Sequence, residues 1–598
     1  MQGLHARAAL ACAVSGRRPV PAQHVKEEPA MEFPPVTVAA WRAQVEKELG
    51  GRSFESALVH EAMERILIAP LYTEAPAAAR ASGDPSAPPF RICMRQARGA
   101  TAADLVADVE GCADALWLGL GDACGAALAP ADFAQTFFVF DTEDVASMEA
   151  VERHVSALTP VAASRFALCM DPLASRARGA APFATLAEEL AALGRVAHFV
   201  EARAPGASAV LVSTLPYHDA GADAADEIAF ALSTGARYLD VLLESGLSPE
   251  QAARQIAVQI AVGRDTFVEL CKLRALRTCF RKLLAAVGAP SGPRTKVHAV
   301  CSSRTLTTRD PWVNMLRVTT QMFSAILGGA DLVTPNAFDQ AFGVPSALAR
   351  RVARNTGLVL REESFLGKVA DPAGGSYYFE TLTDALAREA WQRFRALERE
   401  GGMTDALESG RLAARIEAVA RNWRERIAKR KVPILGVSEF AHLDETQTRP
   451  VPSEEAPPRA AHALAAERDA AAFEALRARA EAAETPPEAV LVTLGSFAES
   501  RPRAGFAAGF FAAGGIRTRE STTDEPAPLV CLCGTDERYT TEAAERARAL
   551  KAAGCKRVLV AGRPSRLDTS LREAGVDGFI FLGCDAVTVL SELLGVLS

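Results

Sequence analysis

The residues that could bind a metal are spread unevenly along this chain. The sequence has nine histidines and the last is His462, so residues 463–598 contain none. Among the twelve cysteines only Cys531 and Cys533 lie close together, and one Cys-x-Cys pair is not a zinc spacing. We therefore expect no metal site, and we interpret the cysteines as reduced core residues of a cytoplasmic protein.

Three other patterns could bind or transfer a group, but each favours a structural interpretation. The Gly-Gly pair at 374–375 lacks the Gly-x-x-x-x-Gly-Lys context of a phosphate loop, so we expect a tight turn. The serine pair at 302–303 has no triad context, which argues against a serine nucleophile. Arg350, Arg351 and Arg354 could bind a CoA phosphate, although a charged surface face of a helix is the favoured interpretation.

The composition excludes several classes of protein. The chain has 598 residues, of which 49% are hydrophobic and 23% are charged, as in globular rather than disordered or fibrous proteins. The formal net charge is −7 and no basic stripe is present, so nucleic acid is not an expected partner. We find no apolar run of the roughly 20 residues that a membrane span needs. We therefore expect a soluble protein of several domains.

Short apolar runs alternate with helical patterns between residues 90 and 440. We expect strands at 115–120, 136–141, 165–171, 209–215, 297–302 and 331–335, with helices such as 224–232, 249–261 and 316–327 between them. Repeated strand–helix units over this length predict an α/β fold, with a closed (β/α)₈ TIM barrel as the best-sized candidate. Its active site would lie at the carboxyl ends of the strands.

Residues 488–598 form a second, smaller α/β pattern. The expected strands are 489–494, a weak 516–518, 529–533, 557–561 and 578–582, with helices such as 541–553 between them. This alternation predicts a flavodoxin-like, doubly wound domain. Ligands of such sheets bind at the carboxyl edge of the strands.

The remaining segments are expected to extend or connect these two domains. Residues 1–30 show no structural pattern, so we interpret them as a disordered extension or a misassigned start; a transit peptide is the alternative. Residues 31–89 are expected to form an N-terminal arm and linker, with short helices at 41–49 and 61–68. Residues 441–487 are expected to form a proline-rich linker followed by a helix.

Several motifs resemble those of one known family. Residues 310–317 read Asp-Pro-Trp-Val-Asn-Met-Leu-Arg, and residues 369–377 read Val-Ala-Asp-Pro-Ala-Gly-Gly-Ser-Tyr. Together with Leu-Gly-Gly-Ala at 327–330, Arg-Asn-Thr at 354–356 and a Tyr-His pair at 217–218, they resemble methylmalonyl-CoA mutase. The resemblance extends over most of the chain and is long and specific between residues 310 and 377.

The resemblance implies a two-domain enzyme. A barrel threads an acyl-CoA through its centre, and the C-terminal domain binds adenosylcobalamin against the barrel, so that the cofactor supplies a radical and the protein shelters it. The family interconverts (R)-methylmalonyl-CoA and succinyl-CoA. In many bacteria it is a heterodimer of a catalytic large subunit and a related small subunit that does not catalyse.

This chain departs from the family pattern at all three cobalamin loops. Catalytic members carry Asp-x-His-x-x-Gly after the first strand, and its His ligates cobalt; the loop at 495–502 has no His, and the hard oxygen donor Glu499 suits cobalt poorly. The acids Asp536 and Glu537 replace a Ser-x-Leu segment and would repel the phosphate of the nucleotide tail. The family's Gly-Gly after the fourth strand appears as an Ala-Gly pair. The degenerate loops include Ser496, Phe497, Glu499, Gly534, Thr535 and Gly562.

The barrel motifs depart in a similar way. Catalytic subunits carry Arg-Gln-Tyr-Ala-Gly, whose Tyr covers the substrate, and this Tyr is Ala97 here. In the family's His-x-Gln-Thr-Ser-Gly motif His298 is retained, but the Gln is Val300 and the Gly is Ser303. An alanine at position 97 cannot do what that Tyr does in the family.

Tyr217 and His218 are the retained catalytic-type pair. In active subunits the matching His donates a hydrogen bond to the thioester carbonyl of the substrate. Because Ala97 and the loop at 495–502 have lost their functional groups, we interpret Tyr217 and His218 as relict residues that persist through packing and hydrogen bonding.

These observations predict the small, non-catalytic subunit of a methylmalonyl-CoA mutase heterodimer. Adenosylcobalamin and the acyl-CoA substrate are expected on the large subunit and neither on this chain, which is expected to act in the cytoplasm. Residues 41–71 are expected to wrap around the partner at a large interface. Two alternatives remain open: a self-sufficient acyl-CoA mutase, and a barrel that binds an acyl-CoA in a regulatory role.

Overall fold

A computed structural model describes residues 36–76, 89–125, 133, 135–142, 148–162, 165–180, 185–204, 206–290, 294–445, 463–564 and 568–597. The expectations for residues 1–30, and for most of the linkers before residue 89 and after residue 445, lie outside the described residues. The chain divides into two units, Met1–His60 and Glu61–Ser598.

The first unit contains two short helices, α2 (Val38–Glu48) and α3 (Phe54–Leu58). The rings of Trp41 and Phe54 meet edge to face, with their centroids 6.0 Å apart. Arg42 pairs with Glu46 at 3.0 Å and with Glu55 at 2.6 Å. A helix at 41–49 was expected, and α2 begins three residues earlier because Thr37 caps it.

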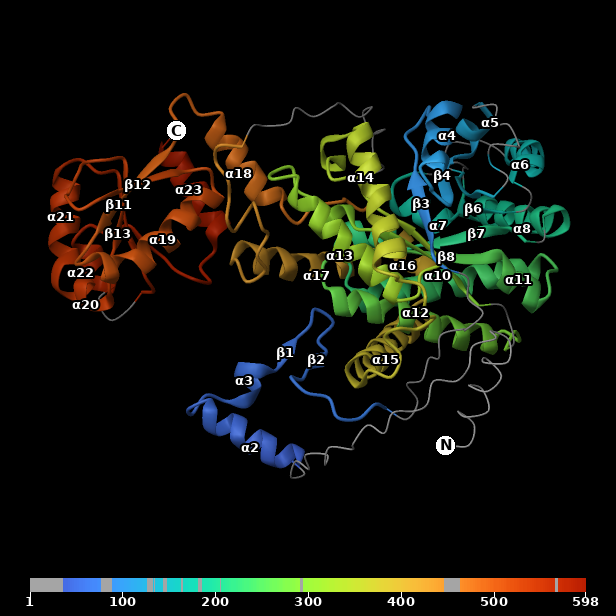
Figure 1. Cartoon of the computed structure of the whole chain (residues 1–598), viewed down its shortest axis with the longest axis horizontal. Coiled ribbons are helices and arrows are strands. Elements are labelled where there is room, and N and C mark those ends of the chain that lie inside the picture. Colours follow the sequence, from blue (N-terminus) through green and yellow to red (C-terminus); the bar gives the residue numbers. More distant parts are fainter. Residues whose placement is uncertain are drawn as a thin grey trace, which may run out of the picture. The chain divides into compact units, whose positions relative to one another are not determined.

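In the second unit, eight parallel strands close into a barrel, which confirms the predicted TIM-barrel fold (Figure 1). The strands are β3 (Arg91–Arg95), β4 (Ala115–Gly119), β5 (Phe137–Asp141), β6 (Phe166–Met170), β7 (Ser208–Ser213), β8 (Ile256–Val262), β9 (Lys296–Cys301) and β10 (Leu332–Thr334). They pair in sequence order, and β10 closes the barrel against β3. Two further short strands, β1 (His60–Glu61) and β2 (Leu67–Ile68), precede them.

Helices connect the strands, and several begin at a capping box. Thr101 caps α4, Thr185 caps α8 and Ser248 caps α11 in this way. The helices of the barrel region are α4 (Ala102–Glu110), α5 (Leu120–Gly125), α6 (Met148–Ala162), α7 (Pro172–Ala177), α8 (Leu186–Arg203), α9 (Leu215–Asp219), α10 (Ala224–Glu244), α11 (Pro249–Gln255), α12 (Thr266–Ala286), α13 (Val313–Leu327), α14 (Ala347–Leu358), α15 (Tyr377–Arg399), α16 (Gly402–Glu408) and α17 (Arg411–Ala428).

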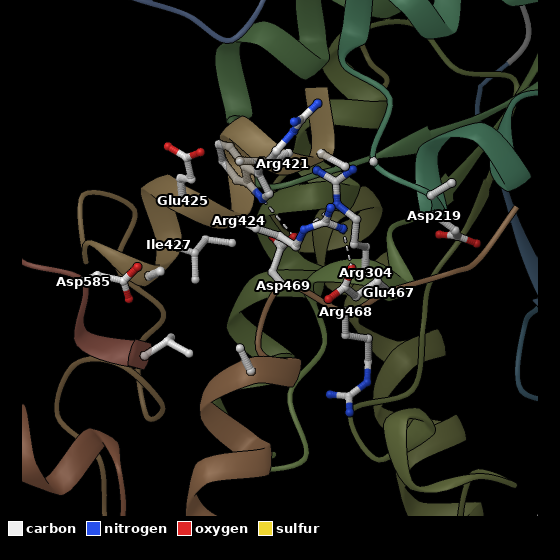
Figure 2. A pocket seen from close by; sticks show the side chains of 17 residues that line it. Asp219, Arg304, Arg421, Arg424, Glu425, Ile427, Glu467, Arg468, Asp469 and Asp585 are labelled. Carbon is white, nitrogen blue, oxygen red and sulfur yellow. Dashed lines mark hydrogen bonds and ion pairs between the residues drawn. The ribbon is translucent and has the colours of Figure 1, made fainter. Parts of the chain in front are cut away.

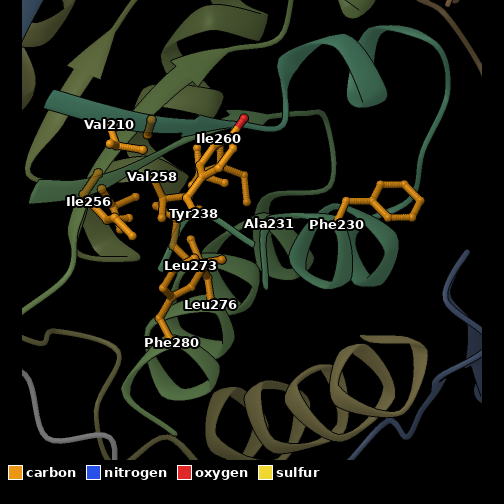
Figure 3. Packing of buried hydrophobic residues seen from close by; sticks show 14 of the residues in the cluster. Val210, Phe230, Ala231, Tyr238, Ile256, Val258, Ile260, Leu273, Leu276 and Phe280 are labelled. Atoms are coloured by element: carbon orange, nitrogen blue, oxygen red, sulfur yellow. The ribbon is translucent and has the colours of Figure 1, made fainter. Parts of the chain in front are cut away.

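The main core lies between the outer face of the barrel and its helices. Figure 3 shows Val210, Val258 and Ile260 of strands β7 and β8 packed toward Leu276 and Phe280 of α12. All five side chains are fully buried. Because side chains alternate along a strand, this outer face uses one set of positions and leaves the other set for the barrel interior.

Two local predictions were wrong. A helix was expected at 249–261, but only α11 is helical, and the buried, β-branched run Ile-Ala-Val-Gln-Ile-Ala-Val forms strand β8. A helix was expected at 61–68, but this segment turns back on itself between β1 and β2 and the amide of Ala62 bonds the carbonyl of Ile66. Strand β3 was not predicted, because its apolar run is only three residues long, Ile-Cys-Met between two arginines, and is too short to be distinctive.

The C-terminal part is a five-stranded parallel sheet in the order β12-β11-β13-β14-β15, which confirms the doubly wound fold. Its strands are β11 (Glu488–Thr493), β12 (Arg517–Ser521), β13 (Leu529–Cys533), β14 (Arg557–Ala561) and β15 (Gly578–Ile580). Its helices are α18 (Ala471–Glu481), α19 (Phe497–Ala513), α20 (Asp536–Arg538), α21 (Ala544–Ala552), α22 (Asp568–Glu573) and α23 (Ala586–Leu597).

Each face of this sheet has its own core. Figure 1 shows α21 and α22 on one side of the sheet and α19 and α23 on the other. Leu491 packs with α19 and α23, whereas its neighbours Val490 and Val492 pack with α21. None of the described helices is both long enough and apolar enough to cross a bilayer.

Candidate functional site

The carboxyl ends of the barrel strands, which we call the barrel mouth, hold the retained Tyr217 and His218. Both side chains lie on the short helix α9, directly after β7, and both are buried. The ring of Tyr217 meets Phe230 edge to face, with their centroids 5.5 Å apart. This is the end of the barrel where TIM-barrel enzymes place their chemistry.

Both ring nitrogens of His218 have partners within the protein. Nδ1 lies 2.9 Å from Oε1 of Glu227 in α10, and Nε2 lies 2.7 Å from Oγ of Ser302, which follows β9. Ser302 is only 2% exposed. The order Ser302–His218–Glu227 is that of a hydrolase triad, but burial of Ser302 leaves a substrate no access to its hydroxyl.

The carboxylate of Glu227 is the centre of a buried charge cluster. Lys272 of α12 lies 2.9 Å from Glu227 and 2.6 Å from Glu269, and Thr214 donates a hydrogen bond to Glu227 at 2.8 Å. Burial raises the pKa of Glu227, but the charges of Lys272 and His218 outweigh it and hold that pKa at about 2. Glu227 is therefore ionised, and it orients the imidazole of His218.

His298 is likewise held inside the barrel rather than exposed to a ligand. Its Nε2 lies 2.8 Å from the hydroxyl of Thr334, and its Nδ1 accepts a hydrogen bond from Gln259 at 3.2 Å. Burial, reinforced by the charge of Arg95, lowers the pKa of His298 to about 3. Its ring is therefore neutral and fully hydrogen-bonded.

Large side chains fill the interior of the barrel. A compact cluster unites inward-facing positions of six strands: Cys93, Ala115, Trp117, Phe137, Val139, Ala167, Val300 and Leu332. Trp117 meets His298 edge to face at 5.4 Å, and the guanidinium of Arg95 lies 4.4 Å from the Trp117 ring. Arg95 ends strand β3, and at the other end of β3 the guanidinium of Arg91 lies 5.1 Å from the centroid of the Phe137 ring. This interior is packed as a core.

The barrel mouth is also crossed by residues 463–470, which we call the closing segment. The amide of Leu464 bonds the carbonyl of Ala177 at 2.8 Å, and the amide of Glu467 bonds the carbonyl of Asp219 at 3.0 Å. The amide of Asp469 bonds the carbonyl of Arg304 at 2.9 Å. The closing segment thus bonds the connections that follow β6, β7 and β9.

A cavity of about 310 Å³ remains beneath the closing segment (Figure 2). Figure 2 shows Arg304, Asp469 and Arg424 gathered around it. Asp469 pairs with Arg304 at 3.2 Å and accepts a hydrogen bond from the Trp423 indole at 2.9 Å. Arg304 and Asp469 therefore neutralise each other at its wall, and neither His218 nor Ser302 borders this cavity.

At the C-terminal sheet, the loop after β11 is held by its own side chains. Ser496 caps α19, and the carboxylate of Glu499 accepts hydrogen bonds from the Ser496 amide and hydroxyl, both at 2.7 Å. Arg538, the last residue of α20, pairs with Glu499 at 3.1 Å. The hydrogen bonds from Arg538 and Ser496 lower the pKa of Glu499 to about 2. Phe497 begins α19 and is 73% exposed.

Tyr539 closes the neighbouring crevice after β13 and β14. Its hydroxyl accepts a hydrogen bond from the Gly534 amide at 2.9 Å and donates to the Ala561 carbonyl at 2.8 Å. Thr535 caps α20 and accepts from the amide of Arg538. The crevice between these strand ends is therefore occupied by protein groups.

Gly562 faces an arginine instead of open space. Arg503 donates a hydrogen bond to the carbonyl of Ala561 at 2.6 Å, and a Cβ built at Gly562 would lie 2.4 Å from its Nη1. Arg503 also pairs with Asp536 at 2.8 Å. The guanidinium of Arg503 therefore compensates the negative charge of Asp536, which was expected to repel a phosphate. Among the described residues, no group of three His, Cys, Asp or Glu side chains could hold a metal ion.

We expected Arg350, Arg351 and Arg354 to form a charged surface face of a helix, and this prediction was wrong for Arg350 and Arg354. Arg350 and Arg354 point inward and both pair with Asp108 of α4, the second at 2.9 Å. Their side chains are 23% and 13% exposed, so they tie α14 to α4 instead of forming a surface face. Gly375 has a φ of 84° in a turn, as expected.

The sequence analysis missed the partners that hold these residues in place. Glu227, Lys272, Arg503, Arg538 and Tyr539 came to attention only through the fold, because each contacts a residue from another element. Ser302 and His218 are 84 residues apart, so no local spacing could have paired them. Glu227 lies in the first turn of α10. An acidic residue is common there because it interacts favourably with the helix dipole, so its presence did not indicate a contact with His218.

Comparison with known proteins identifies the chain's relatives. A family model described as methylmalonyl-CoA mutase matches residues 165–501. The methylmalonyl-CoA mutase small subunit of Streptomyces virginiae is 37% identical, over 94% of this chain and 97% of that protein. The probable small subunit of Mycobacterium bovis is 40% identical over 65% of each chain. That of Propionibacterium freudenreichii is 36% identical over 72% of this chain and 69% of its own length.

Proposed function

Because this chain belongs to the methylmalonyl-CoA mutase family, we propose that it is the small, non-catalytic subunit of a heterodimeric mutase. The observation that supports this most directly is that protein side chains occupy the carboxyl ends of β11 and β13 in the C-terminal sheet. There Glu499 pairs with Arg538, and Tyr539 fills the adjoining crevice. The mutase converts (R)-methylmalonyl-CoA and succinyl-CoA into one another, and this subunit would act in the cytoplasm.

The residues at this edge do not fit adenosylcobalamin. A corrin cobalt needs a nitrogen ligand from the loop after β11, and that loop offers an ionised carboxylate already paired with Arg538. Close approach of a cofactor at Gly562 would require displacement of the Arg503 guanidinium. In this proposal the cofactor binds only to the large subunit.

The barrel residues do not fit an acyl-CoA threaded through the centre. Trp117, Phe137 and Val300 pack against one another where the pantetheine chain would pass. At the mouth, Nε2 of His218 bonds Ser302 and is not free to donate to a thioester carbonyl. Both features support the interpretation of Tyr217 and His218 as relict residues with a structural role.

The partner in this proposal is a related large subunit. Three relatives are named as small subunits, which supports an assembly of two different chains. An obligate interface of this kind buries upwards of about 2,000 Å². We propose that the N-terminal residues, including helices α2 and α3, contribute to it by wrapping around the large subunit.

Titration of the purified chain with adenosylcobalamin and with a CoA ester tests the proposal. We expect neither ligand to bind, as measured by the visible spectrum and by calorimetry. Tight cobalamin binding with a nitrogen-ligated spectrum would instead support a self-sufficient mutase. Binding of the CoA ester alone would support a regulatory barrel.

A further inference from the structure

The turn between β1 and β2, residues 62–66, which we call the latch turn, carries a buried carboxyl group to the barrel. Glu64 in this turn is 5% exposed, although its neighbour Arg65 is exposed. The amide of Ala224, the first residue of α10, donates a hydrogen bond to Oε1 of Glu64 at 3.1 Å. The sulfur of Met63, and not the carboxyl of Glu64, contacts Nη1 of Arg426 in α17, at 2.9 Å. The latch turn therefore contacts two helices that are distant from it in the sequence.

Glu64 joins a cluster of buried charges at the start of α10. Asp223, which caps α10, pairs with Arg393 of α15 at 2.7 Å. Asp226 pairs with the same arginine at 3.0 Å and with Arg415 of α17 at 2.6 Å. Both aspartates of this helix end are therefore compensated by arginines that are already engaged.

The cation on the α12 side of this cluster is engaged as well. Lys272 pairs with Glu269 at 2.6 Å and with Glu227 at 2.9 Å. In the part of the chain that the structure describes, no ion pair joins Glu64 to a cation, and the charges that act on it most strongly are those of Asp223 and Glu269. An ionised Glu64 would therefore be an unpaired buried charge close to two others of the same sign.

A proton on Glu64 removes this conflict. Burial and the negative charges of Asp223 and Glu269 raise the pKa of the Glu64 carboxyl to about 7. When the latch turn leaves the barrel, the carboxyl group enters water and its pKa returns to about 4.5. The docked turn therefore binds the proton more tightly than the released turn does, and docking weakens as pH rises from about 4.5 to about 7.

Few other contacts attach this segment. Strands β1 and β2 pair only with each other, so no strand of the barrel holds them. Ala62 is buried, and Ile66 packs against the main core while still partly exposed. A segment with so few buried contacts can open locally while the rest of the chain stays folded. The same segment is the covalent connection from the barrel to α2 and α3.

We propose that the latch turn is a pH-sensitive latch, which docks on α10 while Glu64 is protonated and leaves the barrel when Glu64 loses its proton to water. Release loosens the connection to α2 and α3 and leaves the barrel folded. This inference concerns the chain by itself, so its failure would leave the proposed function unaffected.

Hydrogen–deuterium exchange of the full chain, measured by mass spectrometry at pH 5 and pH 7.5, tests the latch. After correction for the intrinsic pH dependence of exchange, the amides of residues 61–68 should lose at least about tenfold in protection at the higher pH. The amides of α12 should stay protected at both pH values. Unchanged protection of residues 61–68 would overturn the proposal, and so would a loss of protection in α12 to the same final level, because the whole chain would then be unfolding.

Two variants assign the effect to Glu64. Glu64→Gln keeps an acceptor for the Ala224 amide and cannot ionise, so protection of residues 61–68 should change less than twofold over the same pH range. Glu61→Gln, at an exposed position of the same segment, should keep the wild-type loss. A wild-type loss in Glu64→Gln would contradict the assignment.

Tryptic cleavage after Arg65 gives a second test that needs no variant, since this residue is exposed at the tip of the turn. The rate is divided by that of a free peptide of residues 58–72, which removes the pH dependence of trypsin itself. The ratio should rise at least about tenfold between pH 5.5 and pH 7.5, because cleavage requires the released turn. A constant ratio would overturn the proposal.

Discussion

At the scale of single residues, the barrel mouth is organised by buried charges that satisfy one another. Lys272 is fully buried between Glu227 and Glu269, and Glu227 in turn orients His218. Because each charge has a partner, the cluster holds β7, α10 and α12 together without needing a ligand. This network supports the proposed structural role of His218.

Replacement of Lys272 tests this role. Lys272→Met should lower the free energy of unfolding by about 3–5 kcal/mol, because it leaves two buried carboxylates without a cation. Lys282→Met on the same helix is the matched control, since Lys282 is exposed and only stacks over Trp391. Urea unfolding followed by circular dichroism measures both. A similar small loss in the two variants would show that the cluster is not essential.

The buried carboxyl group of Glu64 should make the free energy of unfolding depend on pH. Glu64 is 5% exposed and accepts a hydrogen bond from the Ala224 amide at 3.1 Å. Burial and the charge of Asp223 raise the pKa of Glu64 to about 7. The folded chain therefore binds this proton more tightly than the unfolded chain does, and its stability falls as pH rises from about 4.5 to about 7.

Glu64→Gln should flatten this dependence. The wild-type thermal midpoint should fall between pH 5 and pH 7.5, and the Gln variant should lose less over the same interval because an amide does not ionise. Glu61→Gln, at an exposed neighbouring position, should retain the wild-type slope. Parallel curves for all three proteins would exclude Glu64 as the titrating group.

At the scale of elements, apolar periodicity was sufficient to predict both domains but not every strand. Six of the eight barrel strands and all five C-terminal strands were located, because each is a short apolar run between turn signals. Strand β8 was assigned to a helix because α11 runs into it without a break. The inward orientation of Arg350 and Arg354 depends on Asp108, which is more than 240 residues away in the sequence.

The candidate site was likewise predicted only in part from the sequence. The departures at Ala97, in the loop at 495–502 and at Ala561 could be predicted from the sequence because each falls within a family motif. The groups that replace the lost contacts could not, because they come from other elements. Arg503 reaches Gly562 from α19, and Ser302 reaches His218 from the loop after β9.

The packed interior of the barrel gives a prediction at this scale. Trp117→Ala should destabilise the chain by about 3–5 kcal/mol, because it removes a buried ring that contacts His298 and Arg95. Trp312→Ala is the control: Trp312 is 57% exposed, and its loss should cost less than about 1 kcal/mol. An interior that is open to solvent would give equal, small losses in the two variants.

At the scale of the whole molecule, the closing segment and α18 fasten the C-terminal part to the barrel. Arg309 pairs with Glu481 of α18 at 2.6 Å, and the amide of Thr308 bonds Glu474 at 2.6 Å. Arg477 of α18 is only 1% exposed and pairs with Glu445 at 2.9 Å. These contacts hold α18 against the loop after β9, so the C-terminal part is anchored to the barrel by buried and half-buried ion pairs.

Truncation tests the proposed contribution of the N-terminal residues to that assembly. Removal of residues 1–76 should reduce the yield of heterodimer on gel filtration, because α2 and α3 are then lost. Removal of residues 1–35 keeps both helices and should leave the yield unchanged. An undiminished yield after the longer deletion would place the interface elsewhere.

The amount of cobalamin bound per heterodimer tests the central claim most directly. The chain is co-expressed with the proposed large subunit, and the purified, active complex is assayed for bound adenosylcobalamin and for each polypeptide. The account predicts one cobalamin per heterodimer, and none when the cobalt-ligating His of the large subunit is replaced. Two cobalamins per heterodimer, or one that survives that replacement, would contradict the account, because this chain would then bind the cofactor itself.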